Sequence, residues 1–136
     1  MQNLWNLKDI ESKIKSSPNL ILEEQAKYFE KNVHDILYAK INNAKLNELK
    51  NSTYKLATSF SVVSPVLDNY TYVLFTVYSN PECNYPVLIE VNDDEWEDSE
   101  YECKNEQEFI ESLTKILGSE NTTEIISVLY SKSKNY

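Results

Sequence analysis

Few residues in this chain could do nucleophilic, general-base or metal chemistry. Its 136 residues include one histidine, His34, and two cysteines, Cys83 and Cys103. His34 precedes Asp35, and a histidine–aspartate pair can serve as a base. Neighbouring residues of a strand point to opposite faces, however, and no G-x-S-x-G turn supplies a nucleophile. We therefore interpret His34 as a surface turn residue and predict no catalytic residue.

The two cysteines have the wrong spacing for a metal site. Nineteen residues separate Cys83 from Cys103 and there is no C-x-x-C pair, whereas a zinc site needs several such ligands. A disulfide would require an exported protein in which strands at 85–91 and 100–104 pair. We expect two reduced, buried thiols instead.

Motifs that bind cofactors are missing from the sequence. The single glycine, Gly118, excludes the glycine-rich turns that hold a dinucleotide or a nucleoside triphosphate. The most acidic segment lacks the central glycine of a Ca²⁺-binding EF-hand loop. We therefore predict no cofactor and no specific metal site.

That acidic segment, NDDEWEDSEYE at 92–102, holds seven carboxylates and two large aromatic residues. Three interpretations of it remain open. It could be a solvated hairpin whose charges protect a sheet edge. It could be a docking surface, on which charge steers a basic partner and aromatic side chains anchor it. It could also serve catalysis, although a solvated hairpin tip would not separate the pKa values of two carboxyl groups.

Negative charge is concentrated in the middle of the chain. Residues 56–103 hold ten acidic residues and no lysine, a balance of −10 within a total of −9. Residues 1–55 have nine lysines against seven acids, and residues 104–136 have four against five. There is no arginine. This distribution argues against direct nucleic-acid binding, because such binding requires Lys and Arg side chains that neutralise phosphates. It favours a basic protein partner instead.

Length and hydropathy predict one domain over residues 1–136. A chain of this size, 41% hydrophobic, can bury a core without metal or disulfide support. No apolar run is long enough to span a bilayer. The first residues, MQNLWNLKDIESKIK, lack the apolar stretch of a secretory signal. We expect a cytoplasmic protein without membrane contact.

Hydrophobic periodicity predicts the elements that position these residues. Apolar residues at helical spacing indicate helices at 4–15, 18–32, 105–117 and from 121 onward. Alternating or β-branched segments indicate strands at 35–43, 53–64, 70–78, 85–91 and 100–104. Clustered strands with short connections form an antiparallel meander. The sequence therefore predicts an α+β fold, with four to five strands over about residues 35–104 and both pairs of helices packed on one face.

Residue types at the expected helix ends support these boundaries. Ser17 with Pro18, Asn105 with Glu108, and Asn121 with Glu124 are patterns typical of helix starts. Gly118 is expected to end the third helix.

In composition the chain resembles small bacterial or phage proteins that neutralise others, such as immunity proteins, antitoxins and inhibitors of nucleic-acid enzymes. We predict a non-enzymatic binding protein that presents an acidic surface to a basic protein, such as a nuclease or a nucleic-acid-binding protein. The alternative is a small enzyme that uses carboxylates and tyrosines of the sheet. The predicted contact residues are Asp93, Asp94, Glu95, Trp96, Glu97, Asp98, Glu100 and Tyr101.

Overall fold

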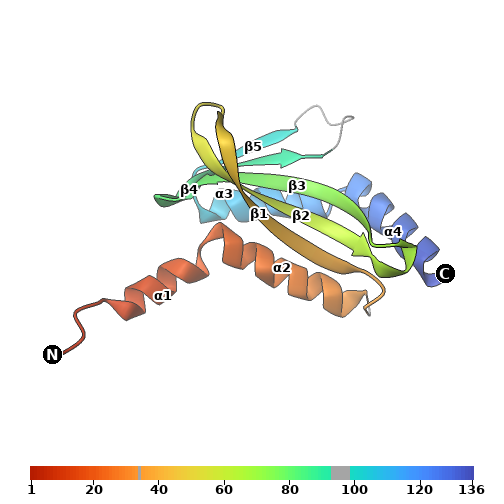
Figure 1. Cartoon of the computed structure of the whole chain (residues 1–136), viewed down its shortest axis with the longest axis horizontal. Coiled ribbons are helices and arrows are strands. Elements are labelled where there is room, and N and C mark those ends of the chain that lie inside the picture. The colour runs from red at the N-terminus through yellow and green to blue at the C-terminus, as the bar shows by residue number, and fades with distance from the viewer. Residues whose placement is uncertain (34, 93–98) are drawn as a thin grey trace.

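A computed structural model describes residues 1–33, 35–92 and 99–136 of the chain. Within these residues the strands form one antiparallel sheet in the order β1-β2-β3-β4-β5 (Figure 1). The elements are α1 (Leu7–Lys15), α2 (Pro18–Asn32), β1 (Tyr38–Lys50), β2 (Tyr54–Ser64), the 3₁₀ turn η1 (Pro65–Leu67), β3 (Tyr70–Asn80), β4 (Cys83–Val91), β5 (Glu100–Cys103), α3 (Glu106–Leu117) and α4 (Glu120–Lys134). The predicted α+β fold with an antiparallel meander is confirmed.

Helices α2, α3 and α4 lie on one face of the sheet (Figure 1), and the core lies between the two layers. Phe60 of β2 and Phe75 of β3 stack at its centre, with ring centroids 5.2 Å apart. The helices contribute Leu22, Phe109 and other fully buried side chains to the same cluster. Helix α1 differs from the other three because it has no buried residue.

The boundaries of β1, β3 and β4 differ from the predicted ones by more than one residue. Strand β1 begins at Tyr38, after Asp35 adopts a positive φ of 62°, and continues to Lys50 rather than ending near residue 43. Most residues in the second half of β1 are exposed. This half therefore lacks the alternation of apolar and polar residues by which a strand is predicted. The predicted loop at 79–84 is shorter in the structure, because β3 and β4 extend into it and leave a tight turn.

Most of the helix ends follow the predicted capping residues. The Ser17 and Asn105 side chains accept hydrogen bonds from backbone N–H groups in the first turns of α2 and α3. The cap predicted at Asn121 is wrong, because Ser119 takes this role and accepts from the N–H of Thr122. Gly118 ends α3, but with a φ of −91° rather than in the left-handed conformation.

Candidate functional site

Strand register places three acidic side chains together on one face of the β4–β5 pair. The neighbours of Glu90 in β4 are buried among the core residues, so alternation turns Glu90 to the face opposite the helices. Glu100 lies directly across from Glu90, and Glu102 lies across from Leu88, which has the same orientation as Glu90. We call Glu90, Glu100 and Glu102 the outer acidic face.

One lysine, Lys50, reaches this face from β1, the strand at the opposite edge of the sheet. The Nζ atom of Lys50 lies 2.9 Å from Oε2 of Glu90 and 5.3 Å from the centre of the Tyr78 ring. The hydrogen bond to Glu90 is the main reason that the pKa of Lys50 is raised, and the charge of Glu100 adds to the effect. Burial raises the pKa of Tyr78, as does the nearby charge of Glu90.

The Lys50 contact also shows how the sheet is shaped. In the sheet, β2 and β3 separate β1 from β4, so the tip of the β1–β2 hairpin must bend over the outer face to bring Lys50 to Glu90. Figure 1 shows this tip on the side of the sheet away from the helices. Leu88 also points to the outer face but is only 5% exposed. This low exposure is expected if the bent hairpin covers the centre of that face.

Lys50 neutralises only part of the outer acidic face. Glu100 and Glu102 are exposed, and neither forms an ion pair with another residue in the described ranges. Both belong to β5, the last strand of the sheet, so they stand at its edge as far as the described residues show. The carboxylates there are open to a partner from outside the chain.

Of the predicted contact residues, the structure describes two, and they face opposite sides. Glu100 is on the outer acidic face, whereas Tyr101 lies across from Ile89 and packs against the core. The side chain of Tyr101 is therefore not part of that face. The other six, Asp93, Asp94, Glu95, Trp96, Glu97 and Asp98, lie outside the described residues.

Glu90 and Lys50 were not predicted for the site, and Glu102 was predicted only as part of the acidic segment 92–102, not among the named contact residues. Alternation in YPVLIEV could have found Glu90, since Glu90 is the single charged residue in a run of buried ones. Glu102 has the same parity as Glu100 in EYEC and could have been added in the same way. Nothing in the sequence pairs Lys50 with Glu90, because their contact depends on the bend of a distant hairpin.

The two cysteines considered for chemistry are not brought together. His34 lies outside the described residues. Both cysteines are free thiols, and Cys103 lies across from Val87 rather than from Cys83. Cys103 is buried as expected, and this burial raises its pKa. The same expectation is wrong for Cys83, which is exposed because it lies beside the β3–β4 turn. In the described part of the chain, no cluster of His, Cys, Asp and Glu is arranged to hold a metal.

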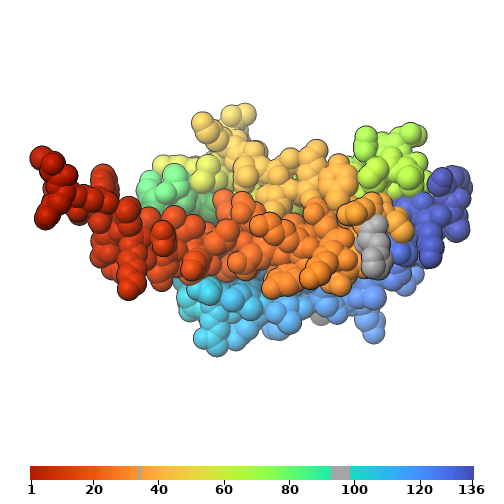
Figure 2. Space-filling view, turned by 90° about the horizontal axis from the view of Figure 1, so that it is seen from below, coloured from red at the N-terminus to blue at the C-terminus, as the bar shows by residue number. Residues whose placement is uncertain are grey.

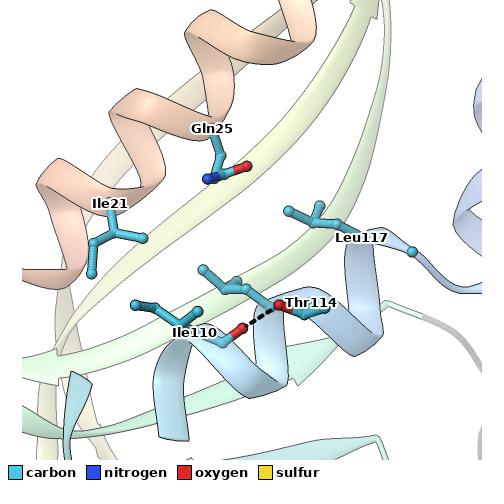
Figure 3. Close-up of a pocket in the computed structure, with 7 residues that line it drawn as sticks. Ile21, Gln25, Ile110, Thr114 and Leu117 are labelled. Carbon is cyan, nitrogen blue, oxygen red and sulfur yellow. Dashed lines mark hydrogen bonds between the residues drawn. The ribbon is translucent and has the colours of Figure 1, made fainter. Parts of the chain in front are cut away.

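The helix side of the molecule has open grooves with mainly apolar linings. One groove, of about 360 Å³, lies between α2 and α3 and is lined by Ile21, Gln25, Ile110 and their neighbours (Figure 3). Another, of about 420 Å³, lies between α4 and the start of β3, where Tyr70 and Val128 line it. Neither groove includes a residue of the outer acidic face.

Two further findings concern membrane crossing and similarity to known proteins. Among the helices that the structure describes, none has both the length and the apolar character that crossing a bilayer requires. Comparisons with protein-family models, with curated proteins and with solved structures find no match to this sequence.

Proposed function

We propose that this protein is a non-enzymatic binding protein whose outer acidic face docks on a basic surface of another protein. The observation that carries the proposal is the register of β4 and β5, which sets Glu90 against Glu100 and places Glu102 beside them. Like charges directly opposite each other on a sheet are destabilising. Lys50 relieves this repulsion at Glu90, whereas Glu100 and Glu102 form no ion pair within the described residues. A basic partner would neutralise these two carboxylates, so the arrangement favours binding.

Protection of a sheet edge explains only part of this charge. Charged side chains on an edge strand prevent pairing with other chains, and Glu100 and Glu102 of β5 fit that role. Glu90 does not, because it belongs to β4, which has neighbours on both sides. The acidic face thus extends beyond the edge, as expected of a contact surface.

The sequence next to this face adds charge and a possible anchor. Residues 93–98 contain five more carboxylates and Trp96. A concentrated negative field speeds the approach of a basic protein, and tryptophan is enriched among residues that dominate binding energy. We include these residues in the proposed contact surface. The partner is a basic protein such as a nuclease or a nucleic-acid-binding protein, met in the cytoplasm.

The proposal can be tested with charge variants once a partner is captured from the native host and purified. Glu100→Gln/Glu102→Gln removes two charges from the outer acidic face. Glu23→Gln/Glu124→Gln removes two exposed charges from α2 and α4 and is the matched control. We expect the first pair to weaken binding about tenfold at low salt, and the control to change it less than about twofold. Equal effects of the two pairs would contradict the proposal.

A further inference from the structure

The ammonium group of Lys50 is held by a carboxylate and an aromatic ring on the outer face of the sheet. Its Nζ atom lies 2.9 Å from Oε2 of Glu90 and 5.3 Å from the centre of the Tyr78 ring. A cation within about 6 Å of the centre of a tyrosine ring is attracted to the face of that ring. The pKa of Lys50 is raised mainly by its hydrogen bond to Glu90, and the charge of Glu100 across the strand pair adds to this. All these groups therefore act on one ammonium group.

A bulge in the β1–β2 hairpin brings Lys50 to this position. The register of the two strands shifts between Lys45 and Lys50, where residues 46–49 of β1 stand against residue 55 alone in β2. Extra residues in one strand of a pair bend that strand and increase its twist. The bend directs the tip of the hairpin over the outer face, so Lys50 can reach Glu90 although β2 and β3 separate their strands.

The tip of the hairpin has a second point of attachment, which does not involve Lys50. Tyr54, which lies across from Lys50, is only 6% exposed. Burial raises the pKa of Tyr54, and the nearby charge of Glu102 adds to the shift. A buried aromatic side chain stabilises a structure far more than an exposed ion pair does. The tip therefore does not depend on the contact between Lys50 and Glu90 to stay in place.

The contact between Lys50 and Glu90 is accessible from outside. The two side chains are 31% and 38% exposed, and Figure 2 shows the turn of the hairpin, in yellow, projecting from the molecular surface. An ion pair this exposed contributes little to stability, and a lysine side chain can leave it by rotation about the single bonds of its flexible stem. Another cation can thus replace Lys50 beside Glu90 without any movement of the backbone.

We propose that Glu90 and the ring of Tyr78 form a binding site for a lysine ammonium group, which Lys50 fills in the free protein and a lysine of the basic partner fills in the complex. The site belongs to the outer acidic face, so the proposal rests on the function proposed above. Binding must then displace the Lys50 side chain, and Lys50 acts as an internal competitor for this face.

The first test follows Lys50 by NMR in the full chain, with hexalysine as the probe. Protons that lie over an aromatic ring are shifted upfield, so the Hε protons of Lys50 should resonate upfield of those of Lys45, an exposed residue of β1. Addition of hexalysine should shift the side-chain carboxyl signals of Glu90, Glu100 and Glu102. It should also return the Lys50 protons toward the position of the Lys45 protons, because the probe displaces the side chain.

The second test measures the affinity for hexalysine at low salt by titration calorimetry. Lys50→Met removes the internal competitor and should strengthen binding about threefold. Lys45→Met, the matched control, removes the same charge from an exposed position of β1 and should change the affinity less than about 1.5-fold. In a Glu90→Gln background the gain from Lys50→Met should disappear, because the two cations no longer compete for a carboxylate. Circular dichroism checks that each variant is folded.

The two tests separate failure of the competition from failure of the proposed function. Carboxyl signals of Glu100 and Glu102 that do not respond to hexalysine would contradict the proposed function and the competition with it. Carboxyl signals that respond while the Lys50 protons stay upfield would overturn the competition alone, as would equal gains from Lys50→Met and Lys45→Met. Lys50 protons without an upfield shift in the free protein would overturn it as well.

Discussion

The ammonium group of Lys50 lies 2.9 Å from the carboxylate of Glu90, although 40 positions separate the two residues in the chain. The contact ties the tip of the β1–β2 hairpin to the outer acidic face and neutralises one of its carboxylates. It also leaves Glu100 and Glu102 exposed at the sheet edge. The ion pair thus limits the negative charge of this face.

Replacement of Lys50 should have opposite effects on stability and on binding. Both side chains of the ion pair are about one-third exposed, so Lys50→Met should lower the free energy of unfolding by no more than about 1 kcal/mol. The same change should strengthen binding to a basic partner, because Glu90 is no longer neutralised. Lys55→Met is the matched control, since Lys55 pairs with the more exposed Glu82. Urea denaturation and titration calorimetry measure the two effects, and weaker binding by Lys50→Met would contradict the account.

Truncation of a buried leucine in α3 should be costly. Leu113 is 3% exposed within the core, so Leu113→Ala should lower the free energy of unfolding by about 2–5 kcal/mol. Val128→Ala, at an exposed position of α4, should cost less than about 1 kcal/mol. Chemical denaturation of both variants tests this. Similar losses would mean that α3 does not form part of the core.

The turn between β1 and β2 offers a stabilising substitution. Asn51 and Ser52 both have left-handed φ values, 56° and 60°, and this conformation costs roughly 1–2 kcal/mol for a residue with a side chain. Ser52→Gly should therefore raise the free energy of unfolding by about 1 kcal/mol. Thr53→Gly should lower it, since Thr53 has no positive φ and glycine adds freedom to the unfolded chain. Thermal denaturation that ranks the two variants in the reverse order would refute this reading of the turn.

Alkaline pH should destabilise the fold through Tyr85. Burial raises the pKa of Tyr85 to about 12, and the charges of Glu106 and Cys103 add to the shift. An unfolded tyrosine ionises near pH 10, so between about pH 10 and 12 the folded state keeps a proton that the unfolded state has lost. The contribution to stability is complete below pH 10 and falls as the pH rises through this window.

Tyr85→Phe should reduce this pH dependence, although it also removes the hydrogen bond to Ser16. Urea denaturation at several pH values between 8 and about 11.5 gives the slope. Tyr28→Phe, at an exposed position of α2, is the matched control. An unchanged slope in Tyr85→Phe would show that another group causes the alkaline loss.

The sequence was sufficient for the fold because its signals are local and agree with one another. Phe109, Leu113 and Ile116 recur at helical spacing after a capping Asn105, and the structure buries all three. The polar half of β1 had no such signal, because an exposed edge strand needs no apolar alternation. Its extent is set by pairing with β2, which only the folded chain shows.

The candidate site was predicted only as an acidic region. Its composition was evident from the residue types. The alternation of EYEC could have separated Glu100 from Tyr101 in orientation, but both were predicted as contact residues, and the structure places them on opposite faces. The opposition of Glu90 and Glu100 depends on strand register, and the contact with Lys50 depends on the bend of the sheet. The first joins consecutive strands, and the second joins residues 40 positions apart. Both depend on how the strands pair and bend in the folded sheet, so periodicity could not provide them.

The most direct test of the proposed function is to map the contact surface by NMR. Isotope-labelled protein would be titrated with the purified basic partner while backbone and side-chain chemical shifts are followed. The account predicts that the largest changes fall on residues 88–91 and 93–103, with the side chains of Glu90, Glu100 and Glu102 among them, and that they shrink as salt is added. Largest changes on α1 or on the α2–α3 groove, with the outer acidic face unaffected, would contradict it.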